Sequence, residues 1–275
     1  MDGQLKILNV GAHPADAFDR VGGTMAQHVR RGDEVCVAVL SHGVRSHAWK
    51  AFDERKATGE TPEIAPLIDE KEREVIEGCR ELGVTDVRFL KHEDEVILVR
   101  EDMIGQIADV IRDFRPNIII THHPREGHPA HAACAEMTLL ALDVASGIRA
   151  SDNGQSKGHK VAQVFFTSLS GRMNVLENDN PRWPSILVDI ADVIDQKLKA
   201  MQKLKSQYYS GPLGKKVLDV YEGYYGLHAR VPWVEPFVAY KLEVYKHLVV
   251  SDFNLELAKK SSAEAFEYST RMIEA

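Results

Sequence analysis

Residues 5–16 read Leu5-Lys6-Ile7-Leu8-Asn9-Val10-Gly11-Ala12-His13-Pro14-Ala15-Asp16, and this stretch decides the fold. The apolar, β-branched run up to Gly11 predicts a strand, and His13 and Asp16 follow directly after it. In an open α/β sheet the active site lies at the carboxyl ends of the strands. Because imidazole and carboxylate groups are metal ligands, the sequence predicts two ligands of a metal ion at this edge of the sheet.

A second stretch, residues 118–131, repeats the pattern. The apolar run Ile118-Ile119-Ile120 leads into a loop rich in histidine, and a helix is expected from about Ala132 to Val144. Surface loops often carry single histidines, but here four of the 12 histidines of the chain lie between His122 and His131. Two such loops side by side can form a His/Asp/His site with an open position, which is typical of catalytic zinc.

Composition limits the class of protein. With 275 residues, of which 44% are hydrophobic, the chain can bury one α/β core, so we expect a single domain over residues 1–250 and a peripheral helical extension over residues 251–275. A net charge of −7 argues against a surface for nucleic acid or anionic membrane. No apolar run approaches the ~18 to 20 residues that span a bilayer, and no basic-then-apolar signal is found. We therefore expect a cytoplasmic protein.

Strands and helices alternate along the chain, which predicts a Rossmann-like α/β fold: an open, mostly parallel sheet with helices on both faces. The segment 41–66 is polar and expected to be irregular, on the active-site side of the sheet. The expected strands cover residues 5–10, 34–40, 87–90, 118–120, 161–168 and 186–190, and the expected helices cover residues 19–31, 68–82, 103–114, 132–144 and 193–208.

Two motifs resemble those of a known family. The stretches Ala12-His13-Pro14-Ala15-Asp16-Ala17 and His128-Pro129-Ala130-His131 are similar to the Ala-His-Pro-Asp-Asp-Glu and His-Pro-Asp-His motifs of the LmbE-like or PIG-L superfamily of zinc-dependent N-deacetylases. The resemblance extends over about residues 5–240. It implies an LmbE-like fold and one divalent ion, Zn²⁺, bound by His13, Asp16 and His131. It also implies that His128 stabilises the oxyanion or acts as an acid.

The sequence departs from the family at the catalytic base. Ala15 replaces the first Asp of the Asp-Asp pair, and Ala130 replaces the Asp of the second motif. Loss of a positioned base costs ~100- to 10,000-fold in rate, so another group must take this role in a hydrolase. Glu126, Asp19 and His123 are the candidates, although each is also compatible with a solvated loop position.

Two other functions remain open. A hydratase branch of the superfamily, similar to 4-oxalomesaconate hydratase and acting on an unsaturated dicarboxylic keto acid, also has Ala ahead of the ligand Asp. A metal-binding protein without activity is the other alternative. We rank metal-dependent hydrolysis of an amide (N-acyl) bond first and hydration second.

The substrate is expected to be a small molecule, and several side chains favour an anionic group on it. Lys71 lies where many family members have an Arg that contacts substrate, although a Lys on a helix often makes only surface contacts. Arg45 and Arg125 lie on loops at the active-site side, and Asp94 follows a predicted strand. These four residues are the predicted substrate contacts. We also expect a homo-oligomer, with the C-terminal segment packed peripherally or against another subunit.

Overall fold

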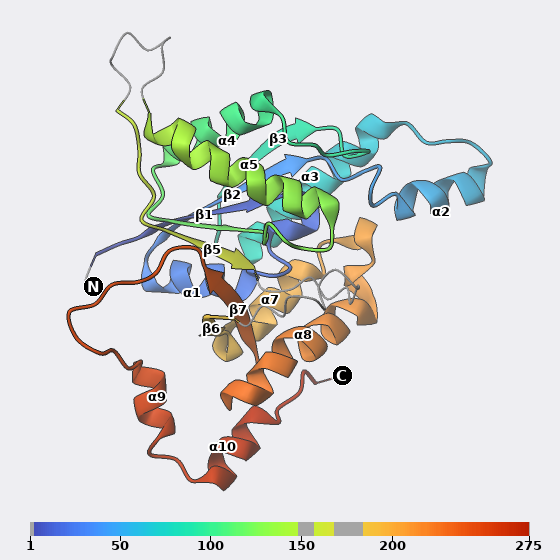
Figure 1. Cartoon of the computed structure of the whole chain (residues 1–275). Coiled ribbons are helices and arrows are strands. Elements are labelled where there is room, and N and C mark those ends of the chain that lie inside the picture. The colour runs from blue at the N-terminus through green and yellow to red at the C-terminus, as the bar shows by residue number, and fades with distance from the viewer. Residues whose placement is uncertain (1–2, 148–156, 168–183, 275) are drawn as a thin grey trace.

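A seven-stranded sheet forms the centre of the computed structural model, which describes residues 3–147, 157–167 and 184–274 (Figure 1). The strand order is β3-β2-β1-β4-β5-β7-β6. All neighbours pair in parallel except β7, which is antiparallel to both β5 and β6. The strands are β1 (Lys6–Gly11), β2 (Glu34–Ser41), β3 (Asp86–His92), β4 (Ile118–Thr121), β5 (Gln163–Thr167), β6 (Ile186–Asp189) and β7 (Val234–Ala239). The predicted mostly parallel sheet is thus confirmed.

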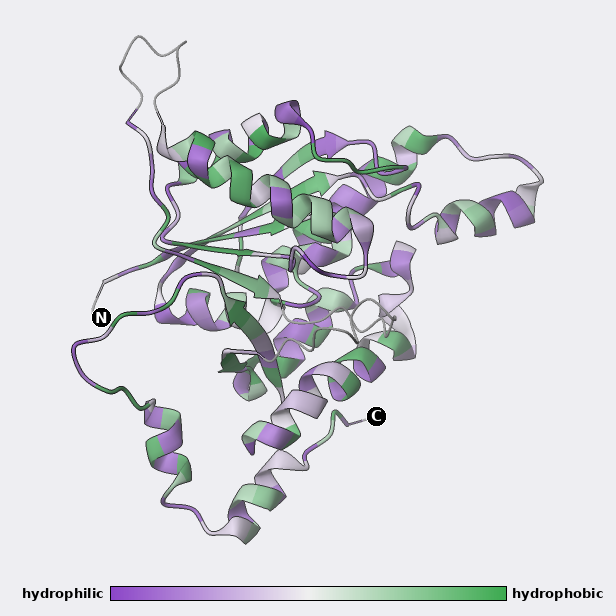
Figure 2. Cartoon of the chain, viewed as in Figure 1, coloured by the Kyte–Doolittle hydropathy of each residue, from purple (hydrophilic) through white to green (hydrophobic). Residues whose placement is uncertain are grey.

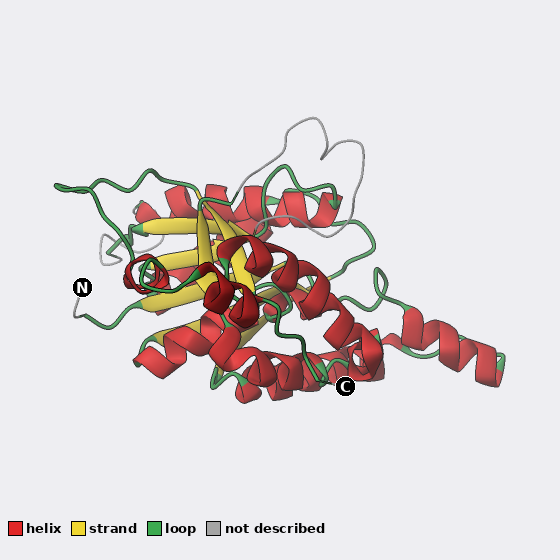
Figure 3. Cartoon of the chain, turned by 90° about the horizontal axis from the view of Figure 1, so that it is seen from below, coloured by secondary structure: helices red, strands yellow, loops and turns green. Residues whose placement is uncertain are grey.

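Helices cover both faces of the sheet, as predicted (Figure 3). One apolar cluster lies under α1 (Gly22–Arg31), α3 (Ile64–Glu81), α7 (Ile194–Met201) and α8 (Gly214–Ala229). The other lies under α4 (Glu101–Phe114) and α5 (Pro129–Ser146). The strand β1 contributes to both, because successive side chains of a strand point to opposite faces: Ile7 belongs to the first cluster and Leu8 to the second.

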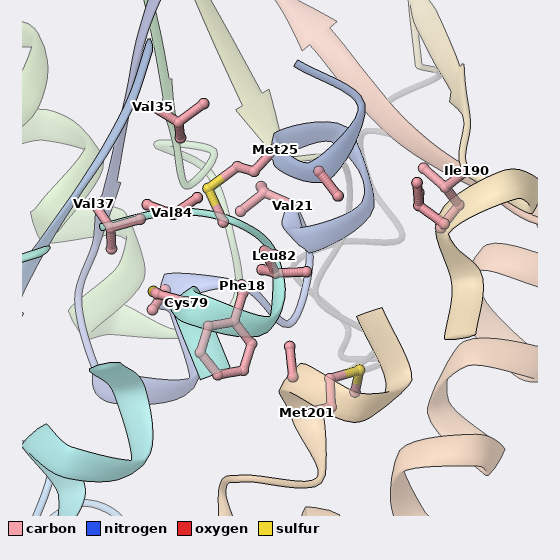
Figure 4. Packing of buried hydrophobic residues seen from close by; sticks show 14 of the residues in the cluster. Phe18, Val21, Met25, Val35, Val37, Cys79, Leu82, Val84, Ile190 and Met201 are labelled. Atoms are coloured by element: carbon pink, nitrogen blue, oxygen red, sulfur yellow. The ribbon is translucent and has the colours of Figure 1, made fainter. Parts of the chain in front are cut away.

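The first apolar cluster supports the turn that carries His13 and Asp16. Phe18, just beyond the turn, is fully buried among Met25, Cys79 and Leu82 (Figure 4). A Cβ atom on Gly78 would lie 2.3 Å from the ring of Phe18, so this position of α3 requires glycine. The hydropathy colouring shows the same arrangement, with green strands inside and purple outer helix surfaces (Figure 2).

One predicted loop differs from the structure. The segment 41–66, expected to be irregular, contains the helix α2 (Trp49–Thr58), which buries no side chain and projects from the body (Figure 1). It has no apolar stripe, so a sequence pattern cannot reveal it. It is fastened instead by contacts at its first turns: Trp49 stacks near Tyr208, with ring centroids 5.9 Å apart, and Lys50 pairs with Glu70.

Several predicted boundaries were also wrong. The helix expected over residues 19–31 begins at Gly22, after the 3₁₀ turn η1 (Pro14–Ala17). The helix expected over residues 193–208 follows the 3₁₀ turn η3 (Ala191–Val193) and ends at Met201. The 3₁₀ turn η4 (Lys205–Gln207) and the short π-helical segment η5 (Tyr209–Leu213) come after it. The helix α8 and the strand β7 were not predicted.

After β7 the chain leaves the body as an extended segment, forms α9 (Asp252–Leu257) and returns with α10 (Ser262–Ser269) (Figure 1). The helix α10 packs near α8: the guanidinium of Arg230 lies 4.9 Å from the ring centroid of Phe266, and Lys215 Nζ donates to the carbonyl oxygen of Glu274 at 2.7 Å. The division at residue 250 stays a prediction. In the described part of the chain, no helix is long and apolar enough to cross a membrane.

Candidate metal centre and active-site cavity

The first motif forms a tight turn at the carboxyl end of β1. A Cβ atom on Gly11 would lie 2.7 Å from Cβ of Asp16, so only glycine lets the turn fold back against the strand. Asp16 Oδ2 accepts the backbone N–H of His13 at 2.7 Å. This turn places His13 Nδ1 3.4 Å from the same carboxylate oxygen. Two ligand-type side chains three residues apart therefore face one point.

The second motif supplies the third side chain. The strand β4 pairs with β1 in parallel, so the loop after β4 lies beside the first motif. His131 sits in the first turn of α5, and its Nε2 lies 3.6 Å from Asp16 Oδ1. One ligand atom from each of His13, Asp16 and His131 lies within 4.8 Å of the others. The structure thus brings together the three residues predicted to bind the metal.

The chemistry of this cluster fits a divalent ion. His13 is 1% exposed, and neither of its ring nitrogens has a hydrogen-bond partner within residues 3–147, 157–167 and 184–274. An unpaired buried polar atom costs about 1–3 kcal/mol, which a metal–nitrogen bond would offset. Burial lowers the pKa of His131, which favours the neutral imidazole that binds metals. Burial alone would raise the pKa of Asp16, but the charges of His131 and His122 hold it well below its usual range.

Glu126 lies behind the metal cluster. Its Oε1 accepts a hydrogen bond from His131 Nδ1 at 2.7 Å, and its Oε2 lies 3.5 Å from His122 Nδ1. Burial would raise the pKa of Glu126, but the hydrogen bonds from the two histidines lower it. A carboxylate on Nδ1 leaves the other ring nitrogen of His131 for a metal, an arrangement common in zinc sites. This contact orients His131.

His122 was quoted in the sequence pattern without a role, and the structure gives it one. Its Nε2 accepts the backbone N–H of Ala12 at 3.1 Å and lies 3.2 Å from Asp16 Oδ2. His122 therefore joins the two motif loops. The run of four histidines in the sequence pointed to this loop, but it could not distinguish a histidine that joins the two loops from one that binds a metal.

A central cavity of about 210 Å³ opens beside the metal cluster. On the metal side it is lined by Asp16, His131, Ala15 and His128. Asp19, Arg20, His122 and Glu126, which are near the two motifs in the sequence, also line the cavity. The rest of the lining comes from more distant residues: His47, Trp49, Thr167, Gln207, Tyr209, Val217 and Tyr221. The ring of His128 stacks on that of His131, with centroids 4.2 Å apart, so His128 lies next to the metal cluster.

Asp19 is the acidic cavity residue that is not engaged by a histidine. It is 7% exposed, and its Oδ1 has no hydrogen-bond partner. Its Oδ2 lies 3.8 Å from Arg20 Nε, which is longer than a hydrogen bond. Burial raises the pKa of Asp19 to about 7. A carboxylate with a pKa near neutrality is suited to accept and return a proton.

Two predicted substrate contacts fasten a loop in the structure. Asp94 accepts the backbone N–H groups of Ser46 at 2.6 Å and Arg45 at 3.2 Å, and it lies 2.9 Å from His42 Nδ1. Arg45 Nε donates to Glu93 at 2.7 Å. Neither Arg45 nor Asp94 is among the lining residues of the central cavity. Asp94 instead fixes the loop that carries His47 into the cavity.

Three further candidates also lie outside the central cavity. Lys71 is 3% exposed, and its Nζ has no hydrogen-bond partner; it lines a small pocket together with His47. Burial lowers the pKa of Lys71 to about 8. Arg125 is exposed, and His123 contacts Phe166 with ring centroids 5.3 Å apart. Arg20, Gln207, Tyr209 and Tyr221, in contrast, line the cavity although the sequence analysis gave them no role.

Comparison with known proteins agrees with this geometry. Residues 8–142 match the model of the PIG-L family, described as GlcNAc-PI de-N-acetylase. Over these residues the chain is similar to the PIG-L family. The predicted resemblance is therefore confirmed, and the matched residues include both motifs of the metal cluster.

Relatives of the chain include deacetylases and a hydratase. It is 25% identical over 206 residues to the probable N-acetyl-alpha-D-glucosaminyl L-malate deacetylase 2 of Bacillus subtilis, covering 73% of this chain and 82% of that protein. It is 28% identical over 212 residues to the 4-oxalmesaconate hydratase of Pseudomonas putida, covering 74% of each. Among solved structures, the conserved protein TT1542 from Thermus thermophilus matches with a TM-score of 0.68 and 25% identity, covering 88% of this chain and 97% of that one. The expected enzyme class, a deacetylase-like hydrolase with a hydratase second, agrees with these relatives.

Proposed function

We propose that the protein is a zinc-dependent hydrolase that cleaves the amide bond of an N-acylated small polar substrate. One observation carries this proposal: two histidines and a carboxylate converge at the edge of a cavity, and neither ring nitrogen of His13 has a hydrogen-bond partner among the described residues. His13, Asp16 and His131 would hold the ion. Zinc in such a site lowers the pKa of bound water from 15.7 to about 7 and so supplies hydroxide at neutral pH.

Three other cavity residues would transfer protons or orient a metal ligand. Asp19 is the proposed base in place of the missing carboxylate at Ala15, because it lines the cavity and one of its oxygens is unpaired. His128 would stabilise the oxyanion or protonate the leaving nitrogen, since its ring lies against that of His131. Glu126, which the sequence offered as an alternative base, would act by orienting His131.

An anionic substrate is part of the proposal. The two relatives described above act, by their names, on an L-malate glycoside and on oxalmesaconate, and both compounds carry carboxylates. Hydration of an unsaturated keto acid is the second candidate function, because Ala15 lines the cavity and offers no proton acceptor there. The cytoplasmic location stays a prediction.

A substrate panel tests the reaction class. The zinc-loaded protein is offered N-acetylated amino sugars, with and without a carboxylate, and unsaturated dicarboxylic keto acids. Acetate release that His131→Ala abolishes supports the hydrolase. Loss of ultraviolet absorbance with the same dependence on His131 supports the hydratase and contradicts our first choice.

The variant Ala15→Asp sharpens this test. If Asp19 performs the role of the missing carboxylate, the double variant Ala15→Asp/Asp19→Asn should release acetate faster than Asp19→Asn alone. The new carboxylate at position 15 would then act as the base beside the metal cluster. The matched control is Asp19→Asn alone, which should stay slow. No difference between the two variants, with zinc bound in both, would mean that base loss does not limit the rate.

We also propose that the protein forms a homo-oligomer through the extended segment after β7. Leu242, Val244 and Leu248 are 95%, 91% and 105% exposed, and such a concentration of exposed apolar side chains is typical of an interface. The opposite side of the segment is fixed, because Gln163 Nε2 donates to the carbonyl oxygen of Lys241 at 2.9 Å. Light scattering should show a homo-oligomer that the double variant Leu242→Glu/Val244→Glu dissociates, whereas Val96→Glu, at an exposed site before α4, leaves it intact.

A further inference from the structure

We propose that Arg20 and Gln207 form a subsite of the central cavity that binds a carboxylate of the substrate. The proposal deepens the proposed function and depends on it for the metal side of the cavity. Both residues line the same cavity as Asp16 and His131, so one small molecule can reach the metal cluster and the subsite together. The ligand class is a compound with a carboxylate separated by a short chain from the bond that reacts.

Arg20 presents guanidinium donors that form no hydrogen bond with the described residues. Its side chain is 25% exposed, its Nε lies 3.8 Å from Asp19, and its guanidinium lies 4.2 Å from the ring centroid of Tyr221. Within the described part of the chain, no hydrogen bond from this guanidinium is present. The ring of Tyr221 restricts the guanidinium plane while the N–H groups stay available. Such a fork matches the two oxygens of a carboxylate.

Gln207 provides an independent observation at the same cavity. It is 1% exposed, and its Nε2 has no hydrogen-bond partner in the part of the chain that the structure describes. The 3₁₀ turn η4 holds it there, with its backbone N–H donating to the carbonyl oxygen of Leu204 at 3.2 Å. A buried amide without a partner costs about 1–3 kcal/mol, so a ligand oxygen that accepts from it is favoured.

The charges of the cavity no longer oppose an anion once a metal is bound. The carboxylates of Asp16, Asp19 and Glu126 line the cavity, and Arg20 is the guanidinium among the lining residues. A divalent ion and Arg20 together balance these three negative charges. Behind Arg20, the buried ammonium of Lys197 is already paired with Glu222 at 2.8 Å and Glu235 at 2.7 Å. Among the described lining residues, Arg20 is the Arg or Lys side chain that can pair with an anionic ligand, in addition to its contact with Asp19.

Calorimetric titration with succinate, and with its neutral diamide, tests the subsite. Arg20→Gln should weaken succinate binding to the zinc-loaded protein by roughly 10- to 100-fold, the usual effect of removing one partner of a charged hydrogen bond. The control Arg30→Gln removes the same charge from an exposed position of α1 and should bind succinate like the wild type. The diamide should show no difference between the two variants.

Further variants distinguish this subsite from the pocket of Lys71. Two milder variants serve if Arg20→Gln fails to fold. Arg20→Lys keeps the charge but lacks the two parallel N–H donors of the guanidinium, and Gln207→Leu keeps the size of the side chain but lacks the amide. Each should bind succinate several-fold more weakly than the wild type. Loss of binding in Lys71→Gln, with wild-type affinity in Arg20→Gln, would overturn the proposal and assign the anion to the pocket of Lys71. The absence of succinate binding to the wild type, with and without zinc, would also overturn it.

A chelator-treated sample distinguishes failure of the subsite from failure of the proposed function. If the protein takes up no zinc and releases no acetate, the proposed function fails, but the affinity ratio between Arg20→Gln and Arg30→Gln is still measured on the metal-free protein. A ratio above about 10 supports the subsite. A ratio near one overturns it, whatever the outcome of the activity assay.

Discussion

Two clusters of histidine and acidic residues lie at the carboxyl ends of neighbouring strands, and only one of them resembles a functional metal site. In each cluster, His13/Asp16/His131 and His42/Glu93/Asp94, one ligand-type atom per residue lies within 4.8 Å of the others. In the first, both ring nitrogens of His13 are buried and lack a hydrogen-bond partner among the described residues, and one oxygen of Asp16 accepts a backbone N–H group. In the second, Asp94 already accepts two backbone N–H groups and Glu93 is bound by Arg45.

The difference shows that ligand-type residues in proximity are not enough for a metal site. The oxygens of Asp94 are used to close the loop that precedes α2, so a metal would have to replace these hydrogen bonds. At His13, a metal would satisfy atoms that otherwise have no partner. His42 Nε2 is also buried without a hydrogen-bond partner among the described residues, so the carboxylates distinguish the clusters: backbone N–H groups occupy both oxygens of Asp94 but one oxygen of Asp16.

The largest effect on the rate is expected when the proposed base, Asp19, is removed from the cavity beside the first cluster. Asp19→Asn is expected to lower kcat/KM by ~100- to 10,000-fold, because the amide cannot accept the proton. The wild-type rate should fall as the pH drops below about 7, since Asp19 is then protonated and only its ionised form is a base. The pH–rate profile measures this, and zinc content of the variant serves as its control. An unchanged rate would exclude Asp19 as the base.

Loss of the contact between Glu126 and His131 should have a smaller effect, which is on zinc affinity. Glu126→Gln is expected to weaken zinc binding by about 10- to 100-fold, because the carboxylate no longer orients the ring through Nδ1. Competition with a chromophoric chelator measures the affinity. Glu93→Gln is the matched change in the second cluster and should leave zinc affinity unaltered; equal losses in the two variants would contradict the distinction between the clusters.

The smallest effect on metal binding is expected from a change in the second cluster, His42/Glu93/Asp94. Asp94→Asn should lower the free energy of unfolding by about 1–3 kcal/mol, because the loop loses charged hydrogen bonds, with one zinc ion still bound. Hydrogen bonds from His42 and Ser46 outweigh burial and lower the pKa of Asp94 below its unfolded value. Its contribution is therefore present above pH about 4 and is lost as the pH falls through the lower folded pKa.

Urea unfolding of wild type and Asp94→Asn at several pH values measures this contribution. The difference in stability between them should be full at neutral pH and shrink in acid. A difference that grows in acid would mean that Asp94 is destabilising in the folded state.

The sequence predicted those parts of the molecule that depend on local pattern. The strands before His13 and before His122 are apolar runs, so the edge of the sheet that carries the motifs followed from them. The strand β7 was not found, because Pro236 interrupts its pattern. Pro236 lies opposite Leu187 of β6, one residue before the described pairing with β5 begins at Phe237.

The remaining cavity wall depends on tertiary packing. Arg20 comes from the turn before α1, Gln207 from η4 and Tyr221 from α8, and no spacing in the sequence relates them. The contact of Arg20 with Tyr221 arises only when α8 packs beside the first motif. Asp94 was predicted to contact substrate because it follows a strand, but its hydrogen bonds to the backbone of another loop are not visible in the sequence.

The most direct test of the central claim is the metal content of the wild type and of one histidine variant from each cluster. Purified proteins, shown to be folded by circular dichroism, are dialysed with zinc and analysed for bound metal. We expect one zinc ion per chain in the wild type and in His42→Ala, and none in His13→Ala. Zinc retained in His13→Ala, or lost in folded His42→Ala, would contradict the assignment of the metal to His13, Asp16 and His131.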